Sequence, residues 1–157
     1  MSIPPVVPAV AGAALVVAIL WDAFETILVP RRIGRRVRLT RYFYLVTWRV
    51  WRAVALRVPN PSRRESLLGF YGPLSLIILL SCWAAGLILG FALLSVATSG
   101  GGGASAWDFG VALYVSGETF FTLGYGDFTP TTSLGRMLAV MEAGLGFGFL
   151  GTVVGYL

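Results

Sequence analysis

The segment 122–127, with the sequence TLGYGD, contains two glycines separated by a single residue. Glycine reaches positive φ without steric cost, so Gly124 and Gly126 allow successive backbone carbonyls to face the same way instead of alternating as they do in a strand. Four such segments around an axis would stack rings of carbonyl oxygens, which can replace the water around a dehydrated cation. The segment therefore predicts an ion filter.

The composition around this segment is that of a membrane protein. Hydrophobic residues make up 57% of the 157 positions and charged residues 12%, which is too apolar for an ordinary soluble domain. The single Cys82 cannot form an intrachain disulfide, and histidine is absent, so no metal-ligand cluster of familiar spacing is present. Because no nucleophile, base and metal occur together, we expect no enzymatic activity.

Three segments are long and apolar enough to cross a bilayer, and they must position the filter. We expect an N-terminal transmembrane helix over 1–30, an outer helix over 67–98 and an inner helix over 133–157. A capping box formed by Ser105 and Asp108 predicts a pore helix over 106–121. This pore helix is too short to span the bilayer and must be re-entrant, surrounded by protein. The predicted fold is an all-α membrane protein with three transmembrane helices, a re-entrant pore helix and a filter.

Arginines fix the expected orientation. Eleven of the twelve basic residues fall between Arg31 and Arg64, so the positive-inside rule makes the segment 31–66 cytoplasmic, with the N-terminus outside and the C-terminus in the cytoplasm. The expected location is the plasma membrane, in a bacterium the inner membrane. Arg38, Arg41, Arg49 and Arg52 share one helical face. This pattern predicts an interfacial helix that contacts anionic lipid headgroups, and we prefer lipids to nucleic acid as its partner.

Asp22 and Glu25 lie one helical turn apart near the inner end of the first predicted span. Carboxylates near a helix end can reach headgroup water, so we expect an interfacial acidic edge. A proton sensor is the alternative interpretation.

The filter segment resembles the TVGYGD signature of the pore-loop potassium channels, with Leu123 where valine is usual. The resemblance extends from about Ala112 to Gly151. It implies that K⁺ is the permeant ion. It also implies that a ring of four chains with C4 symmetry forms the pore, because each chain carries one filter strand. The positions that correspond to K⁺ ligands, through their carbonyls and one hydroxyl, are Thr122, Leu123, Gly124 and Tyr125.

The same resemblance assigns supporting roles around the filter, where Gly126 and Asp127 complete the signature. Glu118 matches a position whose carboxyl lies behind the filter close to the signature aspartate, and two close carboxyls can share a proton. Tyr114 can donate a hydrogen bond to Asp127. Val115, at a position that is often tryptophan, cannot donate to the filter tyrosine. We therefore expect filter stability to depend on Glu118 and Asp127.

On the predicted inner helix, Gly146 matches the hinge glycine of the family, and close helix packing is the competing explanation for it. In the same register, Phe147, Leu150 and Val154 would face an apolar cavity. Glu142 lies off that face, and an intramembrane carboxylate needs a hydrogen-bond partner or a proton. We expect it to bond pore-helix groups such as Ser116 or Thr119.

These patterns predict a potassium-selective channel built as a homotetramer. Two other functions fit parts of the same pattern. A potassium-uptake transporter subunit would carry four pore loops in one longer chain, and a non-conducting assembly protein would keep the fold without ions in the filter. The gating stimulus is left open by the sequence, and the lack of regularly spaced arginines in any span argues against voltage sensing.

Overall fold

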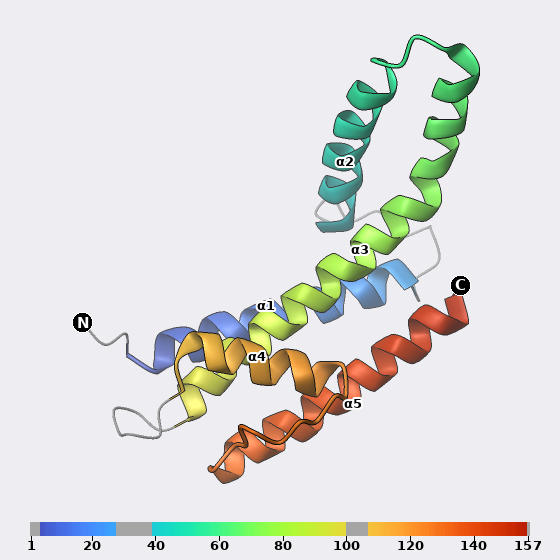
Figure 1. The fold of residues 1–157 in the computed structure, drawn as a ribbon. Helices are drawn as coiled ribbons and strands as arrows, with labels where there is room; N and C mark the ends of the chain where they lie inside the picture. Colours follow the sequence, from blue (N-terminus) through green and yellow to red (C-terminus); the bar gives the residue numbers. More distant parts are fainter. Residues whose placement is uncertain (1–3, 28–38, 100–106, 157) are drawn as a thin grey trace. The chain divides into compact units, whose positions relative to one another are not determined.

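The computed structural model describes residues 4–27, 39–99 and 107–156. Within these ranges every regular element is an α-helix, which confirms the expected all-α fold. The elements in chain order are α1 (Val6–Ile27), α2 (Leu39–Ala55), α3 (Pro61–Thr98), α4 (Phe109–Phe120) and α5 (Ser133–Tyr156) (Figure 1).

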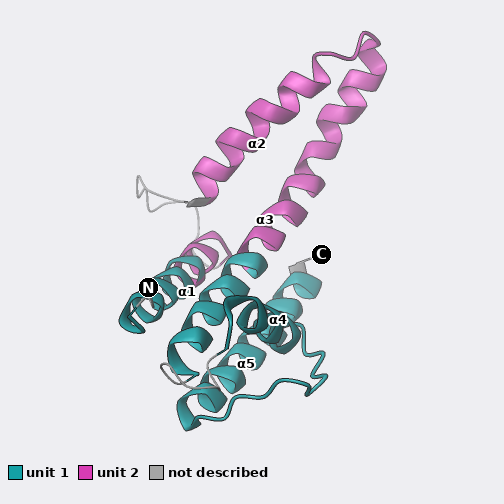
Figure 2. Ribbon diagram, turned by 60° about the vertical axis from the view of Figure 1, so that its left-hand side comes forward, with its two compact units in different colours: residues 1–19, 84–157 teal, residues 20–83 magenta. Residues whose placement is uncertain are grey.

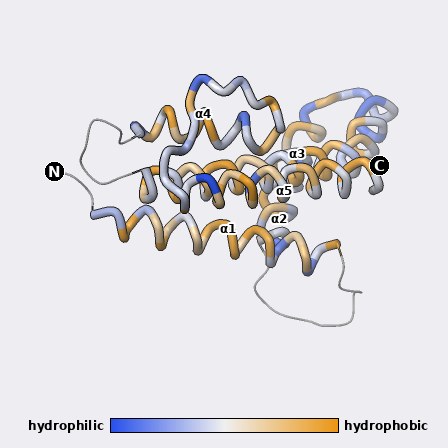
Figure 3. Tube along the Cα trace, turned by 90° about the horizontal axis from the view of Figure 1, so that it is seen from below, coloured by the Kyte–Doolittle hydropathy of each residue, from blue (hydrophilic) through white to orange (hydrophobic). Residues whose placement is uncertain are grey.

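Three of these helices are long and apolar enough to cross a membrane, namely α1, α3 and the stretch Ser133–Gly155 of α5. Hydrophobic residues recur along the whole of α1 (Figure 3). Within the most apolar stretch of α5 only 11% of the residues are buried, against 39% in α3. The apolar surface of α5 therefore needs lipid or other protein chains to cover it. The 12 residues of α4 give about 18 Å of helix, too short to span.

The helix α3 begins at Pro61, earlier than the expected start at residue 67. Proline fits the first turn of a helix because its missing N–H needs no partner there. The Asn60 side chain accepts a hydrogen bond from the Ser62 amide at 3.1 Å and so caps this start. The helix continues through Pro73, and its 38 residues amount to about 57 Å, well beyond the apolar thickness of a bilayer.

The helix α4 begins at Phe109 and ends at Phe120, inside the expected range of 106–121. Its N-cap is Asp108, whose carboxylate accepts a hydrogen bond from the Gly110 amide at 3.4 Å. One acidic residue thus performs the capping that the sequence assigned to a pair. Its expected partner, Ser105, lies outside the described residues.

The chain divides into two compact units, residues 1–19 with 84–157 and residues 20–83 (Figure 2). In the second unit, α2 packs against the first part of α3. Trp51 Nε1 donates to the carbonyl of Leu67 at 2.9 Å. The Trp48 ring packs edge-on against the Tyr71 ring, with ring centroids 4.9 Å apart. The aromatic side chains of α2 therefore hold a helix pair together.

Basic residues occupy the free side of α2, where Arg41, Arg49 and Arg52 are exposed. The fourth arginine of the expected arc, Arg38, lies outside the described residues. The helix therefore has one side that packs on α3 and another that is cationic.

Asp22 is buried in the second unit, and the expectation of an exposed acidic edge is wrong for this residue. Its side chain is only 4% exposed. It accepts hydrogen bonds from Thr40 Oγ1 at 2.6 Å, the Thr40 amide at 3.3 Å and Trp83 Nε1 at 3.0 Å. These donors offset the cost of removing a carboxylate from water. Asp22 therefore joins α1 to both α2 and α3.

In the first unit, α1 crosses α3 where glycines allow close approach. A Cβ added to Gly12 would lie 2.6 Å from the Gly90 carbonyl oxygen, and one added to Gly90 would lie 2.6 Å from Val16 Cγ2. Gly86, one turn before Gly90, packs on the side chain of Ile19. The Gly-x-x-x-Gly spacing of Gly86 and Gly90 is typical of packed membrane helices and can be read from the sequence alone.

Candidate ion filter

The chain leaves α4 through a tight turn that places the filter segment directly at the helix end. The Phe121 amide donates to the Gly117 carbonyl at 3.0 Å, and the Thr122 amide donates to the Thr119 carbonyl at 3.1 Å. The Leu123 amide reaches back to the Glu118 carbonyl at 2.8 Å. The carboxyl end of α4, with its partial negative charge, therefore lies next to the first filter residue.

Backbone angles alternate along the filter segment. Thr122, Gly124 and Gly126 have φ of 56°, 61° and 76°, whereas Leu123 and Tyr125 between them lie outside this region. A strand whose alternate residues take the left-handed conformation turns its peptide planes so that successive carbonyls can face one side. Positive φ is unusual for a β-branched residue such as Thr122 and costs about 1–3 kcal/mol, and such strain concentrates at functional sites.

Side chains on the filter segment are exposed in the single chain. Leu123 is 55% exposed and Tyr125 is 68% exposed. Two large apolar side chains open to the surroundings indicate a surface that is completed by something outside one chain.

Asp127 is held by local hydrogen bonds. Tyr114 donates its hydroxyl to Asp127 Oδ2 at 3.1 Å, as the sequence predicted, and the Phe128 amide donates to Asp127 Oδ1 at 3.0 Å. Desolvation, this hydrogen bond and the charge of Asp127 raise the pKa of Tyr114, so the phenol stays a donor. The Tyr114 ring also packs edge-on against Phe128. The last residue of the filter segment is therefore tied to α4.

Glu118 is buried on α4, with a side chain that is 6% exposed. Among the described residues no hydrogen-bond partner reaches its Oε2. Within the described chain, Glu118 forms no hydrogen bond with Asp127, which accepts from Tyr114 and from the Phe128 amide instead. Val115 is also buried and contributes packing only.

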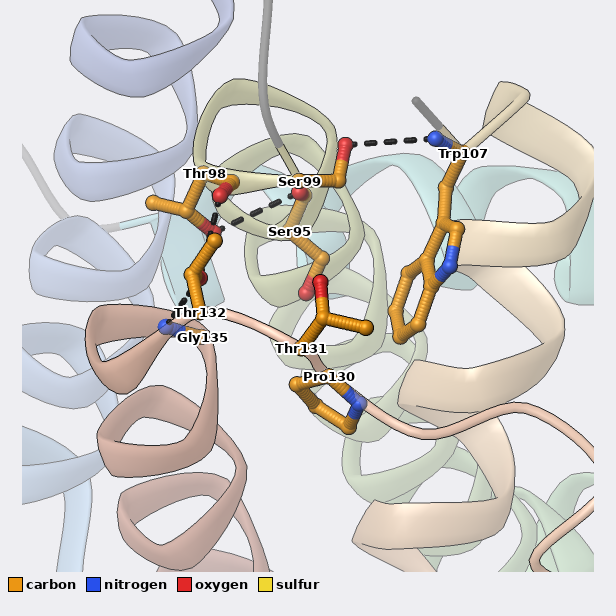
Figure 4. Close-up of a pocket in the computed structure, with 8 residues that line it drawn as sticks. All are labelled: Ser95, Thr98, Ser99, Trp107, Pro130, Thr131, Thr132 and Gly135. Carbon is orange, nitrogen blue, oxygen red and sulfur yellow. Dashed lines mark hydrogen bonds between the residues drawn. The ribbon is translucent and has the colours of Figure 1, made fainter. Parts of the chain in front are cut away.

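A cluster of small polar residues ties the segment after the filter to the end of α3 (Figure 4). Thr132 Oγ1 donates to the Thr98 carbonyl at 3.1 Å and accepts from the Gly135 amide at 3.1 Å, which caps the start of α5. Nearby, the Trp107 amide donates to Ser99 Oγ at 3.2 Å. The cavity between these residues measures about 10 Å³, too small for an organic ligand, so the cluster serves as a clamp.

Gly146 of α5 lies directly against the end of α4. A Cβ added there would overlap the carbonyl group of Phe120, whereas one added to Gly144 or Gly148 would meet nothing within 4 Å. Phe149 packs on the Phe120 ring with centroids 5.7 Å apart. Of the two explanations for Gly146, this geometry supports close packing against α4.

The three residues expected to face a cavity are exposed in the single chain, at 74% for Phe147, 38% for Leu150 and 75% for Val154. Glu142 is different, because it is only 3% exposed and Ser116 Oγ contacts its Oε1. The prediction that Glu142 bonds Ser116 is therefore confirmed.

Replacing Gly146 with alanine is expected to destabilise the protein by about 1–3 kcal/mol, because the added methyl group overlaps backbone atoms that cannot rotate away. Gly148→Ala is the matched control. It adds the same methyl group where there is space, and helix propensity favours it by up to about 1 kcal/mol. Thermal unfolding in detergent should therefore shift in opposite directions for the two variants. Equal shifts would show that Gly146 has room and would favour the hinge explanation.

A family model described as an ion channel matches residues 75–157, more than half of the chain. The chain belongs to this ion channel family. It is similar to two proteins of Methanocaldococcus jannaschii. Identity is 39% over 49 residues to "Potassium channel protein 1", covering 31% of this chain and 15% of that protein. Identity is 51% over 43 residues to "Probable potassium channel protein 2", covering 27% of this chain and 12% of that protein. No solved structure matches at a comparable level of significance.

Proposed function

We propose that this chain is the subunit of a homotetrameric potassium channel that conducts K⁺ through the segment 122–127. The alternating backbone of this segment is the observation that carries the proposal, since positive φ at Thr122, Gly124 and Gly126 suits a column of carbonyls facing one side. Under this proposal the carbonyls of residues 122–125 and the Thr122 hydroxyl are the K⁺ ligands. Similarity to two proteins named as potassium channels supports the choice of ion.

The chemistry of these ligands favours K⁺ over Na⁺. Neutral oxygens of moderate field strength compensate the smaller dehydration cost of K⁺ better than the larger cost of Na⁺, with cavity size as a further factor. The carboxyl end of α4 adds a partial negative charge beside Thr122, which favours a cation at the filter entrance. No charged side chain is needed for this effect.

The unpartnered surfaces of the single chain support a tetramer. Leu123 and Tyr125 are exposed on the filter, and Phe147 and Val154 are exposed on α5. A fourfold axis beside these residues would bring four filters together and make Phe147, Leu150 and Val154 the lining of an apolar cavity. The filter is incomplete without the other three copies.

The membrane setting follows from the arginines. With the basic segment 31–66 in the cytoplasm, the N-terminus and the filter mouth face outward and the C-terminus faces inward. The exposed Arg41, Arg49 and Arg52 on α2 then lie where anionic headgroups can bind them.

Ion flux from liposomes tests the proposal. Purified full-length chain should release K⁺ from loaded liposomes and leave Na⁺ inside, and its mass in detergent should be that of four chains. Equal passage of both ions would contradict the selectivity. A conducting monomer would favour a transporter subunit instead, and a tetramer that conducts neither ion would favour an assembly protein.

A further inference from the structure

Ser116 lies between an oxygen atom of α3 and an oxygen atom of α5. Its Oγ is 2.7 Å from the carbonyl oxygen of Ile88 in α3, and it contacts Oε1 of Glu142 in α5. Ser116 is 1% exposed and Glu142 is 3% exposed, so both side chains are shielded from bulk water. The three groups form a row of hydrogen bonds through the apolar part of the first unit.

The number of available protons decides which group donates and which accepts in each of these hydrogen bonds. A hydroxyl group carries one proton and can donate one hydrogen bond, while its oxygen can also accept one. The Ile88 carbonyl can only accept, and an ionised carboxylate can only accept. An ionised Glu142 would therefore leave two acceptors competing for the single proton of Ser116. A protonated Glu142 satisfies every contact, because its carboxyl donates to Ser116 and Ser116 donates to Ile88.

In the described part of the first unit, no positive side chain pairs with Glu142 to hold it as an anion. Among the described residues of the first unit, α1 from Val6 to Ile19 and α3 from 84 to 98 carry no charged side chain. On α4 the only charge is Glu118, which is about 200° around the helix from Ser116. On α5 itself the nearest charge is Arg136, about 9 Å along the axis, and its Nε donates to the Pro130 carbonyl at 3.1 Å.

We propose that Glu142 is a protonated positioning residue whose carboxyl donates to Ser116, which donates to Ile88, so that the proton ties the inner, pore and outer helices together. Loss of the proton breaks this row of hydrogen bonds and places an unpaired charge among apolar helices. Because α4 leads directly into the filter, loss of the contact between α5 and α4 displaces the filter. The protonation and the helix contacts stand on the fold alone, whereas the effect on conduction rests on the proposed function.

Infrared spectroscopy tests the protonation directly. The protein in liposomes at neutral pH should show the carbonyl stretch of a protonated carboxylic acid, and Glu142→Gln should reduce the band by one carboxyl group per chain. Asp108→Asn is the matched control, since it converts an exposed carboxylate to an amide that can still cap a helix, and it should leave the band unchanged. A spectrum without this band, or a band of native intensity in Glu142→Gln, would overturn the proposal.

The pH dependence of thermal unfolding gives a second readout. The folded chain holds a proton that the unfolded chain releases, so the stability supplied by Glu142 is present at acidic pH and is lost as pH rises. Glutamine keeps the same two hydrogen bonds without a titratable proton. We therefore expect Glu142→Gln to match the native protein at acidic pH and to exceed it at alkaline pH, while Glu142→Ala is less stable throughout.

Parallel pH profiles for the native protein and Glu142→Gln would contradict the proposal, and so would a glutamine variant that fails to fold while Ser116→Ala folds. The K⁺ flux should fall with rising pH in the native protein and stay constant in Glu142→Gln. If the infrared and unfolding results hold but no variant conducts, the proposed function fails and the proton-dependent contact remains.

Discussion

Gly124→Ala is expected to reduce K⁺ flux by more than about 100-fold while leaving the helices folded. At φ of 61° an L-residue costs about 1–2 kcal/mol, and the proposed pore contains four copies, so the filter conformation loses about 4–8 kcal/mol. Each 1.4 kcal/mol is a factor of ten in an equilibrium. Liposome flux compared with helix content by circular dichroism separates the two effects.

Gly117→Ala is the control for this prediction. Gly117 lies on α4 near the filter, a Cβ added there meets nothing within 4 Å, and its φ is not positive. Flux should therefore be nearly native in this variant. A Gly124→Ala protein that conducts K⁺ as well as Gly117→Ala does would show that the left-handed conformation at Gly124 is not needed.

Asp22→Ala is expected to destabilise the protein by about 2–6 kcal/mol, the largest effect outside the filter. The substitution leaves the Thr40 amide and the Trp83 indole N–H without their acceptor, and each buried orphan donor costs about 1–3 kcal/mol. The Thr40 hydroxyl loses Asp22 but keeps Thr26 Oγ1 at 3.1 Å. Asp22→Asn keeps one acceptor oxygen and should lose less. Chemical unfolding in detergent gives the free energies.

A double-mutant cycle tests whether these losses arise from the contacts named. Trp83→Phe removes one donor and keeps most of the ring. If Trp83 Nε1 bonds Asp22, the destabilisation caused by Trp83→Phe should largely disappear in an Asp22→Ala background. Additive losses would mean that the two residues act separately, and the role of Asp22 in joining the helices would be wrong.

The features that follow from local pattern were predictable from the sequence. Composition and run length predict α1, α3 and α5, because an apolar segment of sufficient length needs no knowledge of its neighbours. Gly124 and Gly126 predict an unusual backbone, since glycine spacing acts within the segment itself. Helical periodicity places Glu142 away from the cavity-facing residues of α5, so its bond to Ser116 could be predicted.

The features that depend on distant partners were not predictable. Asp22 is bonded by Thr40 and Trp83, and nothing in the sequence near Asp22 indicates those donors. The aromatic side of α2 packs on α3 through Trp48 and Trp51, and nothing within α2 itself indicates that partner. The sequence predicts an outer helix from residue 67, whereas α3 begins at Pro61, because proline fits the first turn of a helix.

The reversal potential under bi-ionic conditions tests the central claim most directly. Purified protein in a planar bilayer, with K⁺ on one side and an equal concentration of Na⁺ on the other, should carry a current that reverses far from zero, with the sign set by K⁺ leaving its own side. Gly124→Ala should lose this current. A reversal potential near zero, with both ions passing the segment 122–127, would contradict the account.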